Sequence, residues 1–540
     1  MNLRINRWLF GFILIAILVV SFVYLFKFTQ KSYLDFSDSA KYASISKNII
    51  NGQGYGNSFS FWSTDIFELT KQKLFDSPWV PPVMPFSIAG FFKVFGINDF
   101  AVVATSIFYF FFTLIFTYLL GKKLFNSKLI GILSVLAVGG SYDLIHYAIN
   151  GASESPFIFE LVAASYFVSL KKKWASVAVV LLLILMYFTR SQAFIYILGI
   201  VIFWLLLNLK PKKAIFCFIG IVLAGLLVDH FVLLPLNGKY YIYSILERGL
   251  GSGYNQSSTA SDSLRGLAMV APSFTQILKN IFYNLYNFYK NLPEIINPYF
   301  FTFFVVGLFL KSKNRDESNF KIASIFMVLV TLLVTAASIP FYRYIHPIIP
   351  LVYISGVGSL VSIISKSEML NTKYKILASI FLILFFGVGQ TTGKFMLDSR
   401  FEAKTHNNNK PPVYVELSKI LKENTKIDDI VVTNLDTWGS WYGERKTVWF
   451  PINPGQLIDP STGEIPFNAI YLTSYKIDDA NYYMGKDWRM IFENPNDSSK
   501  WKCHGCDKIS QEYVLKGSYK IDSIEDYEKE DASAILLIKR

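Results

Sequence analysis

The chain has 540 residues, of which 52% are hydrophobic, 17% aromatic and 17% charged. Soluble domains carry about 25% charged residues, so this composition excludes a mainly soluble protein, and it equally excludes a disordered, collagen-like or disulfide-scaffold chain. The formal net charge is +13, but the first 393 residues carry 32 basic and 16 acidic side chains while the remainder carry 20 and 23. The excess positive charge therefore belongs to the apolar part, where it indicates membrane topology and not nucleic-acid binding.

Long apolar runs predict about eleven membrane-spanning α-helices. The first, residues 8–26, follows two arginines and is not followed by a small-residue cleavage site, so we expect a retained helix and not a signal peptide. The other runs lie at residues 100–121, 129–148, 155–170, 174–189, 193–209, 214–234, 296–310, 322–339, 345–364 and 376–392.

Basic clusters occur at every second loop between these runs, namely at Lys122–Lys128, Lys171–Lys173, Lys210–Lys213, Lys311–Lys321 and Lys366–Lys375. Lys and Arg accumulate in short cytoplasmic loops, so these clusters predict a multi-pass cell-membrane protein with a cytoplasmic N-terminus. With an odd number of spans, loops 27–99 and 235–295 and the C-terminal segment then lie outside.

Two domains are predicted, a membrane module at residues 1–393 and an extracytoplasmic α/β domain at residues 394–540. In the second, residues 413–424 have a helical pattern, and four short apolar runs predict strands at 430–434, 447–450, 469–473 and 534–538. In loop 235–295, the Gly-, Ser- and Asn-rich stretch Gly249–Ser263 is typical of a mobile lid or substrate loop.

No phosphate-binding loop or dinucleotide fingerprint is present. Nucleotide sugars are not present outside the membrane, so an enzyme that faces outward needs a sugar donor carried by a lipid. The reaction also needs a carboxylate base and cations that bind the lipid phosphate. Asp38 follows the first span and is a candidate base, although an Asp just before a helix is also an ordinary N-cap. Glu154 begins the fourth span, where an acid also favours the helix dipole.

Candidates for binding a phosphate lie at two places on the predicted outer side, and one of them, Arg190, runs against the inside bias of basic residues. Arg190 lies in the turn between the fifth and sixth spans, and Arg343 and His346 lie with Tyr344 at the outer end of the tenth. Arginine holds phosphate through a planar fork, so these four residues are candidates for binding a lipid phosphate. The alternative is that the arginines snorkel to the membrane surface.

Cys503 and Cys506 form a Cys-x-x-Cys pair in the predicted outer domain. Such a pair can form a short-range disulfide, a redox motif or one half of a zinc site. No second Cys pair exists in the sequence to complete a zinc site. We expect a disulfide in an oxidising compartment. No chemistry is assigned to Cys217, which lies in an apolar run.

Five segments together resemble a known family. They are Asp38-Ser39-Ala40-Lys41-Tyr42-Ala43 with the Asn48…Gly54 stretch, Trp79-Val80-Pro81-Pro82, Ser153-Glu154-Ser155-Pro156, Thr189-Arg190-Ser191, and Arg343-Tyr344-x-x-Pro347. In this order they resemble the motifs of C-type polyprenyl-phosphate-sugar glycosyltransferases, especially the bacterial relatives of protein O-mannosyltransferases and of the lipid A aminoarabinose transferase. The resemblance covers the whole membrane part.

The resemblance implies that Asp38 is, or lies beside, the catalytic base. A second carboxylate would come from Glu154 or Glu68, with Asp65 and Asp76 as further candidates. Two departures from the family pattern are Ser39, where many members have Glu, and the Trp79-Val80 pair before the prolines.

The outer domain also resembles that of bacterial members around Ser440-Trp441-Tyr442-Gly443. The resemblance implies that this region shapes the acceptor site. We expect Tyr55, Trp79 and Trp441 on the acceptor side.

The sequence thus predicts an integral membrane glycosyltransferase that transfers a hexosyl or pentosyl group from a polyprenyl-phosphate donor to a lipid, glycan or protein acceptor, with inversion. We expect no cofactor; a divalent metal is possible, but no ligand spacing argues for one. One rival is a flippase or exporter of lipid-linked sugars, for which Asp143, Asp229 and Glu160 are the few ionisable residues in or near spans. The other is a non-catalytic envelope assembly protein whose Asp38 only caps a helix.

Overall fold

The computed structural model describes most of the chain. The described residues are 33–34, 36–62, 66–75, 80–228, 230–231, 273–312, 314–338, 340–368, 371–388, 411–435, 437–451, 453–474, 484–521 and 532–540. The first predicted span, the stretch Gly249–Ser263 and the predicted domain boundary at residue 393 lie outside them, as do Asp65, Asp76, Trp79 and Asp229.

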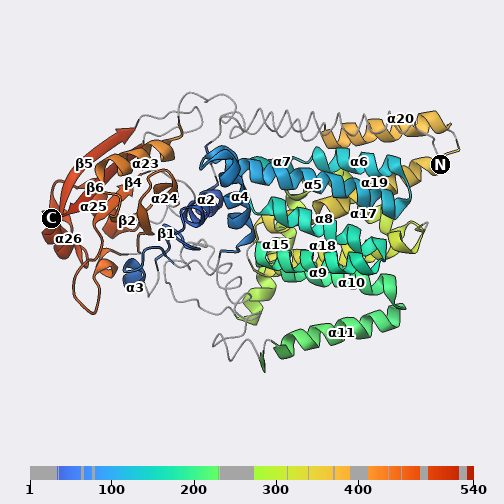
Figure 1. The fold of residues 1–540 in the computed structure, drawn as a ribbon, viewed down its shortest axis with the longest axis horizontal. Helices are drawn as coiled ribbons and strands as arrows, with labels where there is room; N and C mark the ends of the chain where they lie inside the picture. The colour runs from blue at the N-terminus through green and yellow to red at the C-terminus, as the bar shows by residue number, and fades with distance from the viewer. Residues whose placement is uncertain are drawn as a thin grey trace.

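A bundle of apolar helices forms the larger part of the molecule (Figure 1). Its members are α5 (Asp99–Phe125), α6 (Lys128–Gly139), α7 (Tyr142–Ile149), α8 (Glu154–Leu170), α9 (Lys173–Thr189), α10 (Ala193–Asn208), α11 (Pro211–Val228), α17 (Pro298–Phe309), α18 (Arg315–Ala337), α19 (Ile349–Lys366) and α20 (Thr372–Ile383), which a short π-helical segment, η4 (Leu384–Val388), continues. Among the described residues, four helices are long and apolar enough to cross a membrane, and several shorter apolar helices pack beside them. The protein is therefore a membrane protein with several apolar helices, and the number of about eleven spans stays a prediction.

The run 129–148, which the sequence predicts as one span, is broken. Helices α6 and α7 meet at an angle of 63°. The break falls at Gly140 and Ser141, which lie between the two helices. Glycine is a poor helix former and serine favours the start of a helix, so the chain ends one helix and begins another here.

The basic loops gather at one end of the bundle. Lys171 forms an ion pair with Asp316. Asn314 donates a hydrogen bond to the carbonyl of Leu124 at 2.8 Å, and the neighbouring Arg315 donates to that of Leu209 at 2.7 Å. Loops that are far apart in the sequence thus share one end, and the assignment of that end to the cytoplasm stays a prediction.

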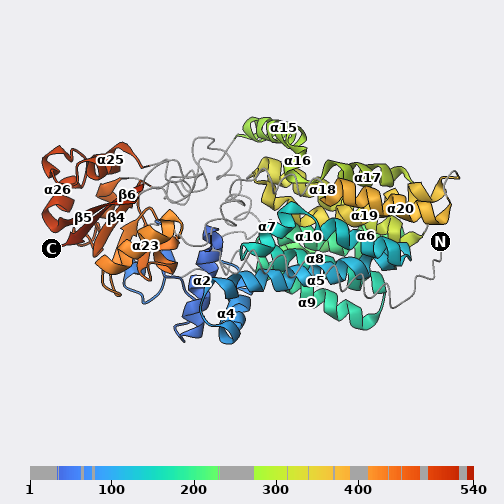
Figure 2. The ribbon, with the colours of Figure 1, turned by 90° about the horizontal axis from the view of Figure 1, so that it is seen from above.

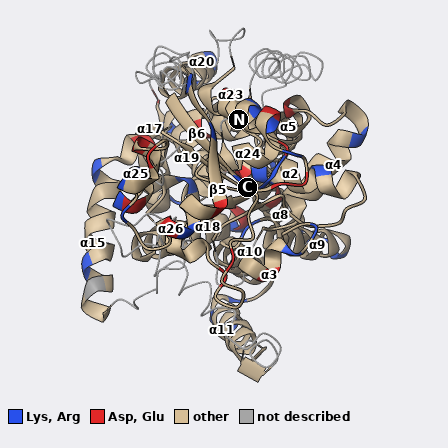
Figure 3. Cartoon of the chain, turned by 90° about the vertical axis from the view of Figure 1, so that its left-hand side faces the viewer, with Lys and Arg blue, Asp and Glu red and all other residues tan. Residues whose placement is uncertain are grey.

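Shorter elements lie at the opposite end of the bundle. They are α2 (Ser37–Ile50), α4 (Val83–Phe95), α15 (Phe274–Lys290), α16 (Leu292–Ile295) and two 3₁₀ turns, η2 (Tyr342–Tyr344) and η3 (His346–Ile348). Helix α3 (Ile66–Thr70) packs instead in an apolar core of the C-terminal sheet. Figures 1 and 2 show α2 and α4 between the bundle and a smaller domain. Figures 1 and 3 show α15 lying across the long axis of the bundle at this end.

The smaller domain is built on a six-stranded sheet in the order β1-β3-β2-β4-β6-β5. Its strands are β1 (Phe59–Ser60), β2 (Ile430–Thr433), β3 (Lys446–Trp449), β4 (Ala469–Thr473), β5 (Tyr513–Ile521) and β6 (Ala532–Lys539). The first four strands in that order run parallel, β6 is antiparallel to β4, and β5 is antiparallel to β6. Strand β1 comes from the first loop and pairs Phe59 with Thr447, so the membrane module contributes an edge strand that the sequence does not predict.

Helices cover both faces of this sheet, which explains why β4 is buried along its whole length. They are α23 (Val413–Asn424), α24 (Trp438–Trp441), α25 (Lys486–Glu493) and α26 (Cys506–Glu512), with 3₁₀ turns η5 (Pro454–Leu457) and η7 (Ser498–Lys500). One face shares its apolar core with the membrane bundle through α23 and α24. The other face forms a separate core with α25, α26 and the segment around β1.

Candidate active site

Asp38 occupies the second position of α2 and faces two cations. Its Oδ1 accepts a hydrogen bond from Lys41 Nζ at 3.0 Å, and its Oδ2 accepts one from Arg343 Nη2 at 3.1 Å. Helix α2 begins at Ser37 after Phe36, and the Asp38 side chain does not cap it. The capping interpretation of Asp38 is therefore wrong.

The charges around Asp38 decide its ionisation. Burial alone disfavours the charged form, but the charges and hydrogen bonds of Lys41 and Arg343 outweigh it and hold the pKa of the Asp38 carboxyl well below its usual range. The side chain is still 23% exposed. Asp38 is thus an ionised carboxylate within reach of a molecule that binds at this end of the bundle.

Glu154 is the first residue of α8, and its side chain is fully buried. Its Oε1 lies 2.6 Å from Arg190 Nη1 and 3.9 Å from Arg343 Nε. The same Arg190 nitrogen donates to Ser153 Oγ at 2.9 Å. A carboxylate with no exposed surface cannot meet an acceptor from solution, so this placement suits Glu154 to orienting the two arginines.

Arg190 directly follows α9, and only 8% of its surface is exposed. A snorkelling arginine extends its charged head to water. Here the guanidinium group instead turns into the protein, toward Glu154 and Ser153. The snorkelling interpretation is therefore wrong for Arg190.

Arg343 joins the two carboxylates. Asp38, Lys41, Glu154, Arg190 and Arg343, called the ion cluster below, contain three cations and two carboxylates. The aromatic ring of Tyr344 lies near both arginines, with its centroid 5.9 Å from Arg190 Cζ and 5.6 Å from Arg343 Cζ. One positive charge remains uncompensated within the ion cluster, which suits it to binding an anion.

His346 follows in η3 and is 5% exposed. Its Nδ1 lies 2.5 Å from the hydroxyl of Tyr147 on α7. The two residues are 199 positions apart, so no local pattern in the sequence indicates the contact. Tyr147 thus places the imidazole next to the turn that carries Arg343.

The other predicted site residues lie apart from the ion cluster or outside the described residues. Glu68 is 75% exposed on α3 and pairs with Lys71 at 2.8 Å. Tyr55 donates to the carbonyl of Val80 at 2.7 Å, and burial raises its pKa to about 12. Trp441 is buried, and its Nε1 donates to Asp99 Oδ1 at 2.8 Å. The structure therefore brings Asp38, Glu154, Arg190, Arg343 and Tyr344 together but places Glu68, Tyr55 and Trp441 in other contacts.

Sequence reasoning missed two residues of this region. Lys41 lies three residues after Asp38 on the same helix face, and this spacing is a readable signal for an ion pair. Tyr42 donates from its hydroxyl to Ser153 Oγ at 3.1 Å, which links α2 to the start of α8. That contact has no counterpart in the local sequence pattern.

Within the described ranges, no three His, Cys, Asp or Glu side chains gather so that they could hold a metal ion. The expectation of a site without a metal stays a prediction.

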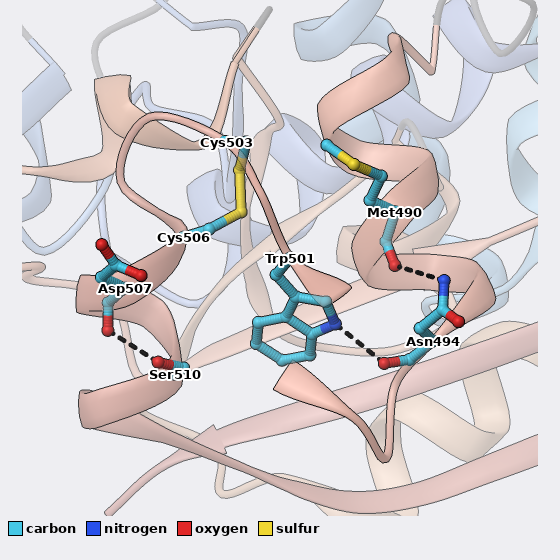
Figure 4. Close-up of a disulfide and its surroundings, with 7 residues drawn as sticks. All are labelled: Met490, Asn494, Trp501, Cys503, Cys506, Asp507 and Ser510. Carbon is cyan, nitrogen blue, oxygen red and sulfur yellow. Dashed lines mark hydrogen bonds between the residues drawn. A yellow bond between two sulfur atoms is a disulfide. The ribbon is translucent and has the colours of Figure 1, made fainter. Parts of the chain in front are cut away.

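Cys503 and Cys506 are joined by a disulfide, as their spacing predicts (Figure 4). The bond closes the turn that leads into α26, beside Trp501, whose Nε1 donates to the carbonyl of Asn494 at 2.8 Å. Disulfides persist mainly in oxidising compartments.

Residues 79–233 match the family model described as dolichyl-phosphate-mannose-protein mannosyltransferase. The matched segment runs from the start of α4 to beyond α11 and includes Glu154 and Arg190. The resemblance predicted from the motifs is thus confirmed. No curated protein sequence matches the chain.

Solved structures add a likeness of fold. An oligosaccharyltransferase from Archaeoglobus fulgidus, crystallised with zinc and sulfate, aligns at a TM-score of 0.52 and 13% identity over 94% of this chain and 72% of that chain. ArnT from Cupriavidus metallidurans bound to undecaprenyl phosphate aligns at a TM-score of 0.48 and 10% identity over 97% of each chain. Its apo form aligns at 0.43 and 12% identity, over 86% of this chain and 92% of that chain. At 13% identity, the likeness to the archaeal oligosaccharyltransferase shows the fold alone.

Proposed function

We propose that the chain is a membrane glycosyltransferase that moves one sugar from a polyprenyl-phosphate donor to an acceptor hydroxyl on the extracytoplasmic face, with inversion. The observation that carries this proposal is the position of Arg343 between Asp38 and Glu154. Arg343 thereby connects the proposed base, Asp38, with the proposed phosphate site at Glu154 and Arg190. The match to a mannosyltransferase family supports the same reaction class.

In the proposed reaction, Asp38 accepts the proton of the acceptor hydroxyl while that oxygen attacks the anomeric carbon from the face opposite the phosphate. The bond between the anomeric carbon and the phosphate oxygen breaks, and polyprenyl phosphate leaves with one additional negative charge. Arg190 and Arg343 stabilise that charge. Glu154 holds both guanidinium groups in place.

Binding of the donor phosphate would also change the basicity of the Asp38 carboxylate. Arg343 holds Asp38 at 3.1 Å in the structure and lowers the pKa of its carboxyl. A phosphate that draws Arg343 away removes one of the two cations that stabilise the ionised carboxylate, so Asp38 becomes a stronger base when the donor is bound.

An apolar groove lined by Phe86, Phe91, Val94 and Phe108 lies between α4 and α5. Helix α4 packs directly on α2, which carries Asp38. We assign the start of the polyprenyl chain to this groove.

The direct test is transfer of radiolabel from a polyprenyl-phosphate sugar to an acceptor by the purified protein in detergent. Polyprenyl-phosphate mannose is the first probe, since the matched family uses mannose. Release or transfer of the label supports an enzyme, whereas movement of the intact lipid across vesicles without cleavage supports a flippase. Mass spectrometry of the lipid that co-purifies identifies the sugar.

The proposed orientation has its own test. Single cysteines at Ser461 and at Ser312, in a Cys217→Ser background, probe the smaller domain and a basic loop, respectively. We expect an impermeant thiol reagent on intact cells to label position 461 and not 312. The reverse pattern would place the ion cluster on the cytoplasmic side and remove the reason for a lipid-borne donor.

A further inference from the structure

The smaller domain reaches the bundle through the short helix α24 and the residues that flank it. Tyr442, which follows α24, is partly buried, and its hydroxyl donates to Asp99 Oδ2 at 2.8 Å. Trp441 donates to the other carboxylate oxygen of Asp99, also at 2.8 Å. Asp99 is the first residue of α5, so both oxygens of a carboxylate on the bundle are bound by the smaller domain.

The residues that flank α24 also bind the backbone around Asp38. The backbone N–H of Leu34 donates to the Tyr442 hydroxyl at 2.8 Å. Thr437, which precedes α24, donates from Oγ1 to the carbonyl of Ser37 at 2.8 Å. The first contact is at Leu34, four residues before Asp38, and the second is at Ser37, directly before it.

The contacts form one unit, called the α24 clamp, which consists of Thr437, Trp441 and Tyr442 with their partners Leu34, Ser37 and Asp99. The Trp441 ring stacks on Phe92 of α4, with centroids 6.1 Å apart and planes inclined by 6°. Burial and the Asp99 charge raise the pKa of Tyr442 well above its usual range, so its hydroxyl stays protonated and can donate to Asp99.

The beginning of α2 is held by groups outside the helix, from both the bundle and the smaller domain. On the bundle side, Ser39 Oγ donates to the carbonyl of Asn150, and Arg343 donates to Asp38. Phe36 offers no side-chain cap, and the first N–H groups of a helix have no partner within the helix. Helix ends fray unless something holds them. Asp38 lies in this first turn, so its position depends on groups outside α2.

We infer that Asp99 and Tyr442 are positioning residues for the reaction: through the α24 clamp, the smaller domain fixes the first turn of α2 and hence the Asp38 carboxylate. The inference rests on the proposed role of Asp38. It assigns the smaller domain a part in catalysis that requires no contact with substrate. A misplacement of about 1 Å at a reacting group costs up to about a hundredfold in rate, so a clamp of this kind controls turnover.

Tyr442→Phe and Asp99→Asn test the inference in the full-length protein. Each variant weakens hydrogen bonds to a charged group, which contribute about 1.5–3 kcal/mol, so we expect amide hydrogen exchange at residues 34–42 to become roughly ten- to a hundredfold faster. Exchange in α17 should not change, because that helix packs on α19, away from α2 and α24. Tyr519→Phe on β5 makes the same chemical change away from the clamp and should leave residues 34–42 as in the wild type.

Kinetics separate positioning from general stability. We expect kcat for polyprenyl-phosphate mannose to fall by about ten- to a hundredfold in Tyr442→Phe, while the affinity for undecaprenyl phosphate per folded molecule stays unchanged. If residues 34–42 of Tyr442→Phe exchange as slowly as in the wild type, the clamp does not hold the first turn of α2. If they exchange faster but kcat is unchanged, the clamp does not position Asp38 for the reaction. If the wild type cleaves no donor, the proposed function fails, and the exchange data still decide whether the clamp holds α2.

Discussion

The two ends of the bundle carry similar kinds of charge in different settings. At the end with the ion cluster, Arg190 and Arg343 have side chains 9% and 29% exposed and face carboxylates from distant elements. At the end with the basic loops, Lys171 is 40% exposed and pairs with Asp316 at the surface. Both ends carry cations, so their number does not distinguish the proposed site. What distinguishes it is that Arg190 and Arg343 are largely enclosed and face carboxylates of different helices.

The two ends should differ most in the stability that the protein loses when an ion pair is broken. Glu154→Gln keeps the shape of the side chain but leaves Arg190 buried without its charged partner, and breaking a buried ion pair costs about 3–5 kcal/mol. Asp316→Asn breaks the exposed pair at the other end and should cost less than about 1 kcal/mol. Thermal unfolding of both variants in detergent measures the difference. Equal losses would contradict the distinction between the two ends.

The next effect concerns the proposed phosphate site. Arg343→Lys keeps the charge but loses the planar fork, and Arg343→Ala loses both, so affinity for undecaprenyl phosphate should fall in the order Arg, Lys, Ala. Because a charged hydrogen bond contributes about 1.5–3 kcal/mol, the Ala variant should bind roughly ten- to a hundredfold more weakly.

Lys172→Ala, in a basic loop at the opposite end, is the control for that series and should bind undecaprenyl phosphate like the wild type. Isothermal titration in detergent, or retention on phosphate-lipid beads, measures these affinities. If all four proteins bind alike, Arg343 does not contact the phosphate.

The smallest effect is on pH dependence. Lys41 helps to hold the pKa of Asp38 below its ordinary value of 3.8, so the acidic limb of kcat/KM in the wild type should lie below that pH. Lys41→Met removes a positive charge, which makes the carboxylate easier to protonate and should move the limb upward by about one pH unit. Lys47→Met, on the same helix, should not move it. An unshifted limb in Lys41→Met would show that another group controls the profile.

Much of the fold follows from periodicity and apolar runs. The predicted run 155–170 is α8, the run 174–189 is α9, and the helix predicted at 413–424 is α23. These elements follow from local pattern, because one continuous run or one amphipathic face defines each of them. The break at Gly140 was readable from its composition but was outweighed by the apolar run around it.

Long-range contacts explain what the sequence could not predict. Strand β1 has only two residues and exists because Phe59 and Ser60 pair with β3 almost 400 positions later. Arg343 meets Asp38 across 305 positions, so the motifs named both residues but not their contact. Lys41 was readable from its spacing, whereas the pair of Tyr147 and His346 was not.

Turnover by two matched variants tests the central claim most directly. Asp38→Asn and Asp316→Asn make the same chemical change at the two ends of the bundle, and Asp38→Asn keeps the shape while losing the proton acceptor. We predict that Asp38→Asn lowers kcat for a polyprenyl-phosphate sugar by about a hundredfold or more, within the range for a general base, and that Asp316→Asn leaves it unchanged. Near-normal turnover by folded Asp38→Asn protein would contradict the assignment of the ion cluster as the active site.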